Sequence, residues 1–593
     1  MSKWGRLLLL MVFSLVIMRI PVFAEGPGED ESASFDQIES MLARQKVKAE
    51  VFPVEITMKA KMEEEKPKPE LPTEAVFIKQ VDVMGATVLS KKEINEIIME
   101  FRNKELTGKD MQRCADQITD IYALKGFLTS YAYVDLSGLN QGVLVIKAFE
   151  GKVGEVKIEG NRYFSDTVYK KKIGLKKGDV FNFKLLKNNV FQTNRHFDRK
   201  VTPDVALSET QGFTDITIKA KEKLPVHYVI DHDNYGSEYI LTKRYKNTFI
   251  FNNVTGHDDS LNLKAQFCEA DAQRLFDLDY FLPINNTWKW ELYYMPFKRE
   301  NYYYKDNEDK DFLKKAYKWY TYLYQTVVSE PNREFVMNYG FVQKFIEWYT
   351  GEELRKYDKF CALLIGFDYV RVDDYGTTVI SEDLEKGIPR MWGANTAEDS
   401  NCSVKGAGGK YWKQKIAVAR RQKLFWDIDL LMKAQGQYST QACTGVNVFS
   451  MGGYMGTIDN RGYPRAQLPM DSGYYLLGGF SLPAYFIPKN TKLPLVHTDV
   501  YKNLKFLTYV EYAKGYKRSP QSAADKSGSV DPTLTGQQDD DKRKSLSSVG
   551  WGWTFAVPEQ NLSMRFDMAW PLDHKLPKDG SHCHMWYRVT KIF

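Results

Sequence analysis

The chain has 593 residues and a formal net charge of +6, and this length allows three or four domains. So small a positive excess argues against a nucleic-acid partner. The mean hydropathy of −0.44 and the lack of an 18-residue apolar run beyond the N-terminus exclude a polytopic helical membrane protein. The six cysteines stand singly, with no CxxC pair that would indicate a zinc ribbon.

Residues 1–24 have the pattern of an export signal. A basic start (Lys3) precedes the apolar run Leu7–Met18, and Ala24 supplies the small residue after which cleavage is expected. An uncleaved anchor helix is the alternative, but the run ends well short of the ~20 residues that span a bilayer. We therefore expect the mature chain to work outside the cytoplasm, away from cytosolic ATP.

An isolated helix and a linker follow in residues 25–50 and 51–75. Ser34 and Gln37 form a capping box at the start of an amphipathic helix over residues 34–48. The apolar side chains that share one face of this helix are Phe35, Ile38, Met41 and Leu42. Charged and proline-rich sequence after it predicts an extended linker.

An α/β module occurs twice, over residues 76–151 and 152–223. Each copy shows the order β-α-α-β-β, and the glycines that close its first strand, Gly85 and Gly160, lie 75 residues apart. We interpret this as an internal duplication. Chance similarity between two ordinary α/β segments is the alternative.

Residues 224–593 change to period-2 alternation, as in residues 261–267, 288–294 and 426–430. Of the 82 aromatic residues, 62 lie in residues 225–593, and interfacial aromatics are typical of transmembrane β-barrels. We predict an antiparallel outer-membrane β-barrel here; a soluble all-β domain is the alternative. The last six strands are expected at roughly 424–437, 473–486, 504–515, 546–557, 562–572 and 583–593.

The segment from Ala434 to Pro483 carries a resemblance. It contains FSMGG, NRGYP and MDSGYYLLGGFSLP, and it resembles the sixth extracellular loop region of the POTRA–barrel superfamily, where a GG pair precedes an RG[F/Y] motif. The matching positions are Gly452, Gly453, Arg461, Gly462, Tyr463, Asp471, Ser472 and Gly473. The resemblance implies that this loop folds back into the barrel lumen.

The arginine of this motif needs a carboxylate on the barrel wall, because a buried unpaired guanidinium is costly. The family's partner is an Asp on the next ascending strand, and the candidate here is Glu511 in YVEYA. The sequence departs from the family pattern at Asn460, at Glu511 and at Ala513, and it has a longer spacing between the GG pair and RGY.

Two such repeats, an N-terminal helix on a linker and a C-terminal Phe593 together resemble the transporters of two-partner secretion (TpsB type, ShlB/FhaC/HecB-like). The resemblance implies a 16-stranded barrel, a helix 34–48 that plugs it at rest, and a terminal phenylalanine read by the barrel-assembly machinery. It also implies a location in the Gram-negative outer membrane, with the POTRA modules in the periplasm.

The predicted function is ATP-independent export of an unfolded exoprotein through the barrel pore, after the POTRA modules bind it. Expected partners are the exoprotein, outer-membrane lipid, the barrel-assembly machinery and periplasmic chaperones. The alternative is an assembly factor of the same superfamily that inserts other barrels into the membrane; those proteins usually carry more POTRA modules.

We expect no enzyme activity, catalytic residue, cofactor or metal. His582, Cys583 and His584, with His574 nearby, are the best metal candidates, but neighbouring residues on a strand point to opposite faces and cannot converge. A disulfide between Cys402 and Cys443 is permitted by the compartment and stays open.

Overall fold

The computed structural model describes residues 57–59 and 70–593, apart from residues 237–241, 270–272, 303–311, 351–352, 405, 446, 455–458, 494–497, 519–542 and 573–576. The described residues divide into two compact units, one that ends at Leu224 and one that comprises Pro225–Phe593. No helix among the described residues is long and apolar enough to span a membrane.

The first repeat packs two helices on a three-stranded sheet with the order β3-β6-β5. Its elements are β2 (Val76–Ile78), β3 (Gln80–Met84), α3 (Lys91–Ile98), β4 (Lys104–Leu106), α4 (Gly108–Lys125), β5 (Tyr131–Asp135), the 3-10 turn η1 (Leu136–Gln141) and β6 (Val143–Phe149). Capping boxes at Ser90 and Thr107 start the two α-helices. The apolar faces of these helices meet the sheet in one core around Phe101, Ile118 and Tyr122.

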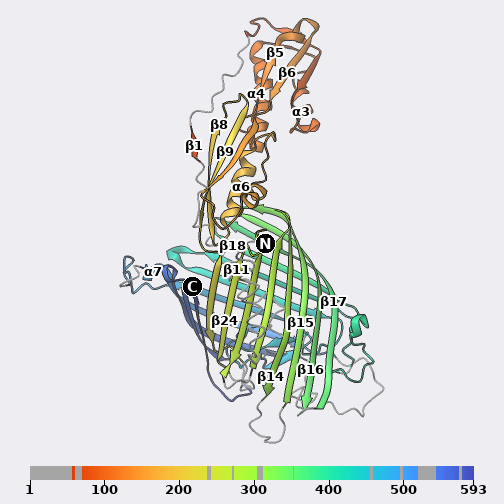
Figure 1. Cartoon of the computed structure of the whole chain (residues 1–593), viewed down its shortest axis with the longest axis vertical. Coiled ribbons are helices and arrows are strands. Elements are labelled where there is room, and N and C mark those ends of the chain that lie inside the picture. Colours follow the sequence, from red (N-terminus) through yellow and green to blue (C-terminus); the bar gives the residue numbers. More distant parts are fainter. Residues whose placement is uncertain are drawn as a thin grey trace. The chain divides into compact units, whose positions relative to one another are not determined.

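The second repeat has the order β-α-α-β-β, which the first repeat shares apart from its short additional strands β2 and β4 and its 3-10 turn. Its elements are β7 (Lys152–Glu159), α5 (Asp166–Ile173), α6 (Phe183–Asn194), β8 (Arg199–Leu207) and β9 (Phe213–Glu222). A short linker strand, β1 (Thr57–Lys59), joins this sheet, which has the order β1-β8-β9-β7 (Figure 1).

Matching contacts in the two repeats support the duplication. Gly85 and Gly160 both have a left-handed φ, +83° and +79°, and a Cβ at either position would lie within 2.6 Å of an alanine carbonyl oxygen on the last strand. Two residues after that alanine, Glu150 and Glu222 each accept hydrogen bonds from backbone amides just beyond the glycine. Each carboxylate also accepts a hydrogen bond from a buried tyrosine.

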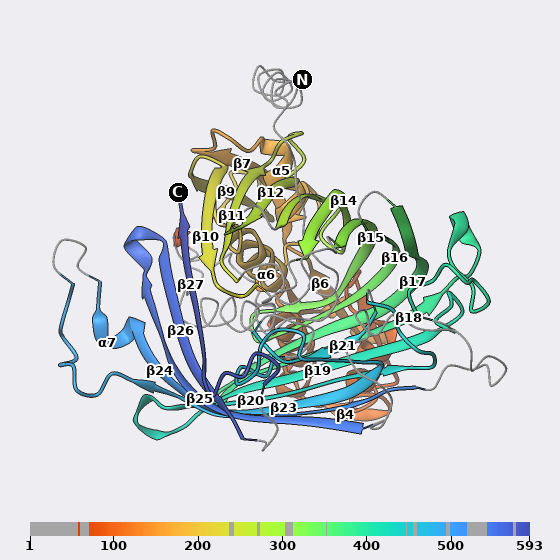
Figure 2. The same ribbon diagram turned by 90° about the horizontal axis from the view of Figure 1, so that it is seen from below.

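The second unit is a closed antiparallel barrel in which 16 strands of the described chain pair in order, and β10 pairs with β27 to complete the ring (Figures 1 and 2). The strands are β10 (Val226–Asp233), β11 (Arg244–Asn252), β12 (Ser260–Cys268), β13 (Gln273–Pro283), β14 (Trp288–Tyr302), β15 (Phe312–Glu330), β16 (Arg333–Thr350), β17 (Glu353–Asp373), β18 (Gly376–Gly387), β19 (Trp412–Lys423), β20 (Asp429–Ser439), β23 (Ser472–Pro483), β24 (Leu504–Tyr516), β25 (Arg543–Val557), β26 (Leu562–Pro571) and β27 (His584–Ile592).

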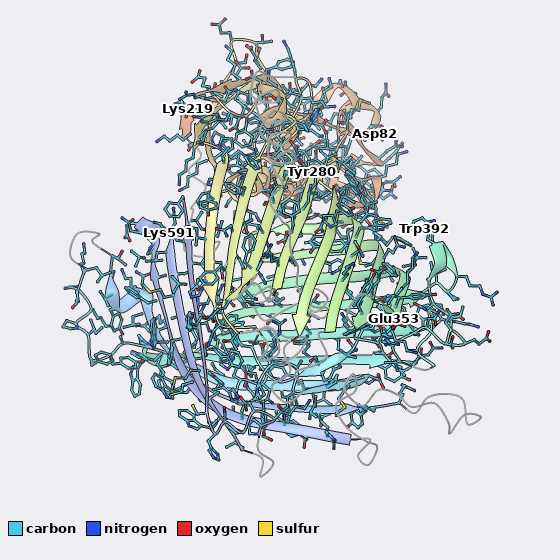
Figure 3. All side chains as sticks on the ribbon, turned by 60° about the horizontal axis from the view of Figure 1, so that its bottom comes forward. Asp82, Lys219, Tyr280, Glu353, Trp392 and Lys591 are labelled. Atoms are coloured by element: carbon cyan, nitrogen blue, oxygen red, sulfur yellow. The ribbon has the colours of Figure 1, made fainter. Side chains whose placement is uncertain are left out.

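Barrel strands place polar and apolar side chains on opposite faces. On β24, Glu511 is fully buried, whereas its neighbour Val510 is 54% exposed. Leu363 and Ile365 on β17 and Leu476 on β23 are likewise exposed. Figure 3 draws the side chains on the ribbon, with Tyr280 of β13 and Lys591 of β27 labelled among them. An apolar outer face and a polar interior are the arrangement of a transmembrane barrel.

The strand predicted to begin near residue 424 is placed wrongly. Phe425–Asp427 forms a 3-10 turn between β19 and β20, and Trp426 adopts a left-handed φ of 58°. The Leu424 amide donates to the carbonyl of Ile428, and the Ile428 amide donates to the carbonyl of Phe425. These bonds close the turn, so β20 begins only at Asp429. The prediction began the strand too early because Trp426 continues the alternation of Ile428 and Leu430 in the sequence, although it lies in the turn.

Candidate functional site

Residues 440–471, which we call the inner loop, connect β20 to β23. Two short strands within it, β21 (Phe449–Met451) and β22 (Leu468–Met470), pair with each other. Side chains of this loop pack with interior residues of β23, β24, β25 and β26 in one buried cluster that includes Tyr463 and Tyr509. The described part of the loop therefore lies inside the barrel, against its wall.

The glycine pair gives the inner loop its sharp turn. Gly452 and Gly453 have φ values of +105° and +89°, which L-residues with a side chain rarely adopt. Gly453 and Asn460 exchange two backbone hydrogen bonds. Asn460 also donates from its side chain to the carbonyl oxygen of Leu546 on β25, at 3.0 Å. The motif residue Arg461 is thus held at one defined place on the wall.

Arg461 lies between two carboxylates. Its Nε is 3.5 Å from Glu511 on β24, and its Nη1 is 3.3 Å from Asp567 on β26. Its backbone amide also donates to Glu511 at 2.7 Å. The guanidinium stacks on the rings of Tyr509 and Tyr454, at 4.1 and 4.8 Å from the centroids.

Glu511 joins the inner loop to three strands. Besides the Arg461 amide, it accepts hydrogen bonds from Tyr475 on β23 at 2.9 Å and from Ser548 on β25 at 2.8 Å. Ala513, where the family has glycine, is fully buried in the cluster beside it. The buried glutamate therefore accepts hydrogen bonds from the inner loop, from β23 and from β25.

Asp567 is a site residue that the sequence analysis missed. It is fully buried and also accepts from Arg565, at 2.7 Å. The alternation of residues 564–570 did indicate this residue, because Asp567 stands between two apolar residues of the strand. That pattern indicates a lumen-facing position without identifying the basic partner.

Gly462 and Tyr463, which follow Arg461 in the motif, pack against the barrel wall. A Cβ on Gly462 would lie 2.6 Å from Ser548 Cβ and 2.8 Å from the backbone of Trp570 and Pro571. Tyr463 is 1% exposed. The carbonyl of Arg461 accepts a hydrogen bond from the Trp586 indole at 2.8 Å. Only a glycine therefore permits this close approach of loop and wall.

Asp471, Ser472 and Gly473 form the return of the inner loop into β23. Asp471 accepts hydrogen bonds from the amides of Cys443 and Arg518, each at 2.7 Å. The Ser472 hydroxyl accepts from the Ser439 amide at 2.9 Å, which closes the base of the loop.

The remaining predicted residues lie elsewhere. Phe35, Ile38, Met41 and Leu42 fall outside the described residues. Phe593 follows β27, exchanges backbone hydrogen bonds with Tyr228 and stacks on its ring at 6.0 Å.

Of the candidate metal ligands, His582, Cys583 and His584 are described, whereas His574 lies outside the described residues. His584 contacts Asp579 at 2.8 Å and the Gly462 carbonyl at 3.0 Å. Within the described part of the chain, no group of three or more His, Cys, Asp or Glu side chains is placed to hold a metal. Cys402 and Cys443 are both free thiols, so the disulfide left open above is not formed.

A second candidate site is the edge of β8 in the second repeat. The backbone of β1 pairs with it in parallel, with Thr57, Met58 and Lys59 opposite Asp204, Val205 and Ala206. This edge thus accepts an added extended segment, which is one of the recurring ways in which proteins bind peptides.

Family models match residues 76–500 of the chain. The ShlB-type POTRA domain matches residues 76–151, a surface-antigen repeat of the POTRA type matches residues 151–223, and the haemolysin secretion/activation protein ShlB/FhaC/HecB matches residues 212–500. The fold class is confirmed: two POTRA domains precede a closed 16-stranded antiparallel barrel. These features define an outer-membrane POTRA–barrel protein.

Known proteins of similar sequence are transporters. The outer membrane transporter CdiB of Escherichia coli O6:K15:H31 is 21% identical over 69% of this chain and 70% of its own length. The hemolysin transporter HpmB of Proteus mirabilis is 24% identical over 76% of this chain and 80% of its own. The solved structure of CdiB from Escherichia coli superimposes with a TM-score of 0.71, at 19% identity, over 94% of this chain and 97% of that one.

The chain belongs to the two-partner secretion transporters of the ShlB/FhaC/HecB family. Its barrel lies in the outer membrane and its POTRA domains lie in the periplasm. Members of this family work with an exoprotein partner.

Proposed function

We propose that this chain captures an unfolded exoprotein on its POTRA domains and exports it through the barrel without ATP. The names of its relatives support a transport role. The observation that carries the capture step is the pairing of β1 with the edge of β8, because an exoprotein segment would use the same backbone groups.

Export also requires that the lumen opens. The inner loop fills part of the interior through the Arg461 contacts with Glu511 and Asp567, and residues 25–50, outside the described chain, would supply the plug helix. In this proposal, periplasmic chaperones deliver the exoprotein and the barrel-assembly machinery inserts the transporter. Folding of the exoprotein outside the cell then gives the transport its direction.

A cysteine tether tests the capture step. Lys59 and Ala206 are direct partners across β1 and β8, so Lys59→Cys combined with Ala206→Cys allows oxidation to hold the linker on the edge. We expect secretion of the partner exoprotein to stop on oxidation and to resume on reduction. The matched control is Lys59→Cys alone, which should secrete under both conditions. Undiminished secretion with a complete cross-link would contradict capture at β8.

The same strains separate export from barrel assembly. If the chain is an assembly factor, its deletion lowers the amounts of other outer-membrane barrels while the partner exoprotein still leaves the cell. Export predicts the reverse pattern. Translocation of the purified unfolded exoprotein into proteoliposomes without nucleotide tests independence from ATP.

A further inference from the structure

The inner loop has a second buried attachment, far along the ring of strands from Arg461. Asn447 lies near the start of the loop, and its side-chain oxygen accepts hydrogen bonds from Lys413 on β19 at 2.9 Å and from Lys344 on β16 at 3.1 Å. Its backbone carbonyl accepts a third, from Gln437 on β20, at 2.9 Å.

A carboxylate completes this cluster. Glu385 on β18 lies 2.7 Å from Lys413 and 3.9 Å from Lys344, and it accepts a hydrogen bond from Tyr411. Asn447, Lys344, Lys413 and Glu385 are all at most 6% exposed. Bonds between a neutral oxygen and buried ammonium groups are stronger than neutral pairs, and their loss leaves buried donors poorly satisfied.

The two attachments use different parts of the wall. Arg461 contacts β24 and β26, whereas Asn447 contacts β16, β19 and β20. Because the inner loop joins the ring between β20 and β23, its two contact regions lie on either side of its own point of attachment. Release of one region therefore leaves the other in place.

We infer that Asn447 is a second positioning residue of the inner loop, which must release the Lys344–Lys413–Glu385 cluster before the lumen opens fully. The inference rests on the proposed export function and adds a second attachment that holds the loop. We call the two attachments, at Arg461 and at Asn447, the latches of the loop. Asn447 acts as a hydrogen-bond acceptor, so an aspartate at this position keeps the latch and a leucine of similar size removes it.

Thiol labelling of the purified full-length chain in detergent tests this inference. Cys443, four residues before Asn447, is free and 6% exposed, and Cys114 in the first POTRA domain is free and fully buried. We expect Asn447→Leu to raise the maleimide labelling rate of Cys443 about tenfold or more, while Cys114 stays protected. Asn447→Asp should label at the wild-type rate.

Each outcome decides the inference. The inference is overturned if Cys443 in Asn447→Leu is labelled at the wild-type rate. It is also overturned if Cys443 in Asn447→Asp is labelled as fast as in Asn447→Leu. If Asn447→Leu also exposes Cys114, the fold is lost, and Asn447→Ala is judged by the same two rates. The labelling rates do not depend on secretion. They therefore test the role of Asn447 alone, whereas the secretion assay of the exoprotein tests the proposed export function.

Discussion

At Arg461 the barrel buries a full positive charge at 1% exposure. Moving such an ion out of water costs several kcal/mol unless close partners compensate. Glu511 and Asp567 supply opposite charge, and Tyr509 supplies a ring face. Arg461 is therefore held strongly only while both carboxylates lie beside it. We call this contact of Arg461 with Glu511 and Asp567 the catch, because the loop is either held by it or released from it.

Replacing one carboxylate should weaken this catch. Glu511→Gln removes the charge beside Arg461 and leaves Asp567 shared with Arg565. We expect the held position of the loop to lose about 3 kcal/mol, which is roughly a hundredfold in the open fraction. Single-channel recording should show longer and more frequent openings.

The control for this substitution is Asp277→Asn. Asp277 is a buried lumen carboxylate that pairs with Lys264 at 3.0 Å and joins β12 to β13. Its loss should leave the gating near that of the wild type. Equal conductance in Glu511→Gln and the wild type would remove Glu511 from the catch.

The sequence identified one of the two carboxylates, for a physical reason. Glu511 stands on the strand that the family motif indicates, whereas Asp567 lies more than 100 residues after Arg461. Alternation tells which face of a strand a residue occupies. It does not tell how far around a closed ring that strand lies from the loop, so Asp567 required the three-dimensional structure. Asn447 escaped prediction for the same reason.

Among the elements, the inner loop depends on one very close backbone approach. Gly462→Ala would place a methyl group 2.6 to 2.8 Å from Ser548 and from the backbone of Trp570 and Pro571. Backbone atoms cannot move aside as a flexible side chain does, so the loop tip must lift. We expect faster proteolysis of the loop and a larger conductance than in the wild type.

Gly478→Ala is the matched control. Gly478 lies on β23, and a Cβ there would meet nothing within 4 Å. This variant should behave as the wild type does. If Gly462→Ala is equally silent, the loop does not pack against the wall as tightly as the distances require.

Strand positions were predicted well because each strand has a polar and an apolar face along its whole length. The expected strand at 504–515 is Leu504–Tyr516, and the one at 562–572 is Leu562–Pro571. The error at residue 424 arose at a turn, where Trp426 is 76% exposed and no sheet imposes the alternation. The linker strand β1 was missed because three residues carry no readable period.

At the scale of the whole molecule, we propose that Phe593 contributes to assembly of the barrel. Phe593 is 60% exposed and stacks on Tyr228 of β10, next to the seam of the ring. If the assembly machinery reads this ring, Phe593→Ser should lower the amount of folded barrel in the outer membrane several-fold, measured by heat-modifiable mobility in gels.

Tyr228→Ala distinguishes recognition from packing. It removes the stacking partner and leaves the terminal phenylalanine intact. Near-normal barrel levels in this variant, with a loss in Phe593→Ser, indicate recognition by the machinery. An equal loss in both variants indicates that Phe593 matters only for closure of the ring.

The strand β1 also sets a threshold for whatever binds in its place. It pairs along three residues, whereas β8 spans the nine residues Arg199–Leu207. The apparent affinity of a competitor falls in proportion to the fraction of time that the edge is free, so a segment that pairs along three residues or fewer gains nothing over the chain's own strand. Longer extended segments displace β1 from the edge of β8 more readily, because each added residue pair adds backbone hydrogen bonds. In the proposed export function, the linker would therefore select cargo by the length of its unfolded stretches.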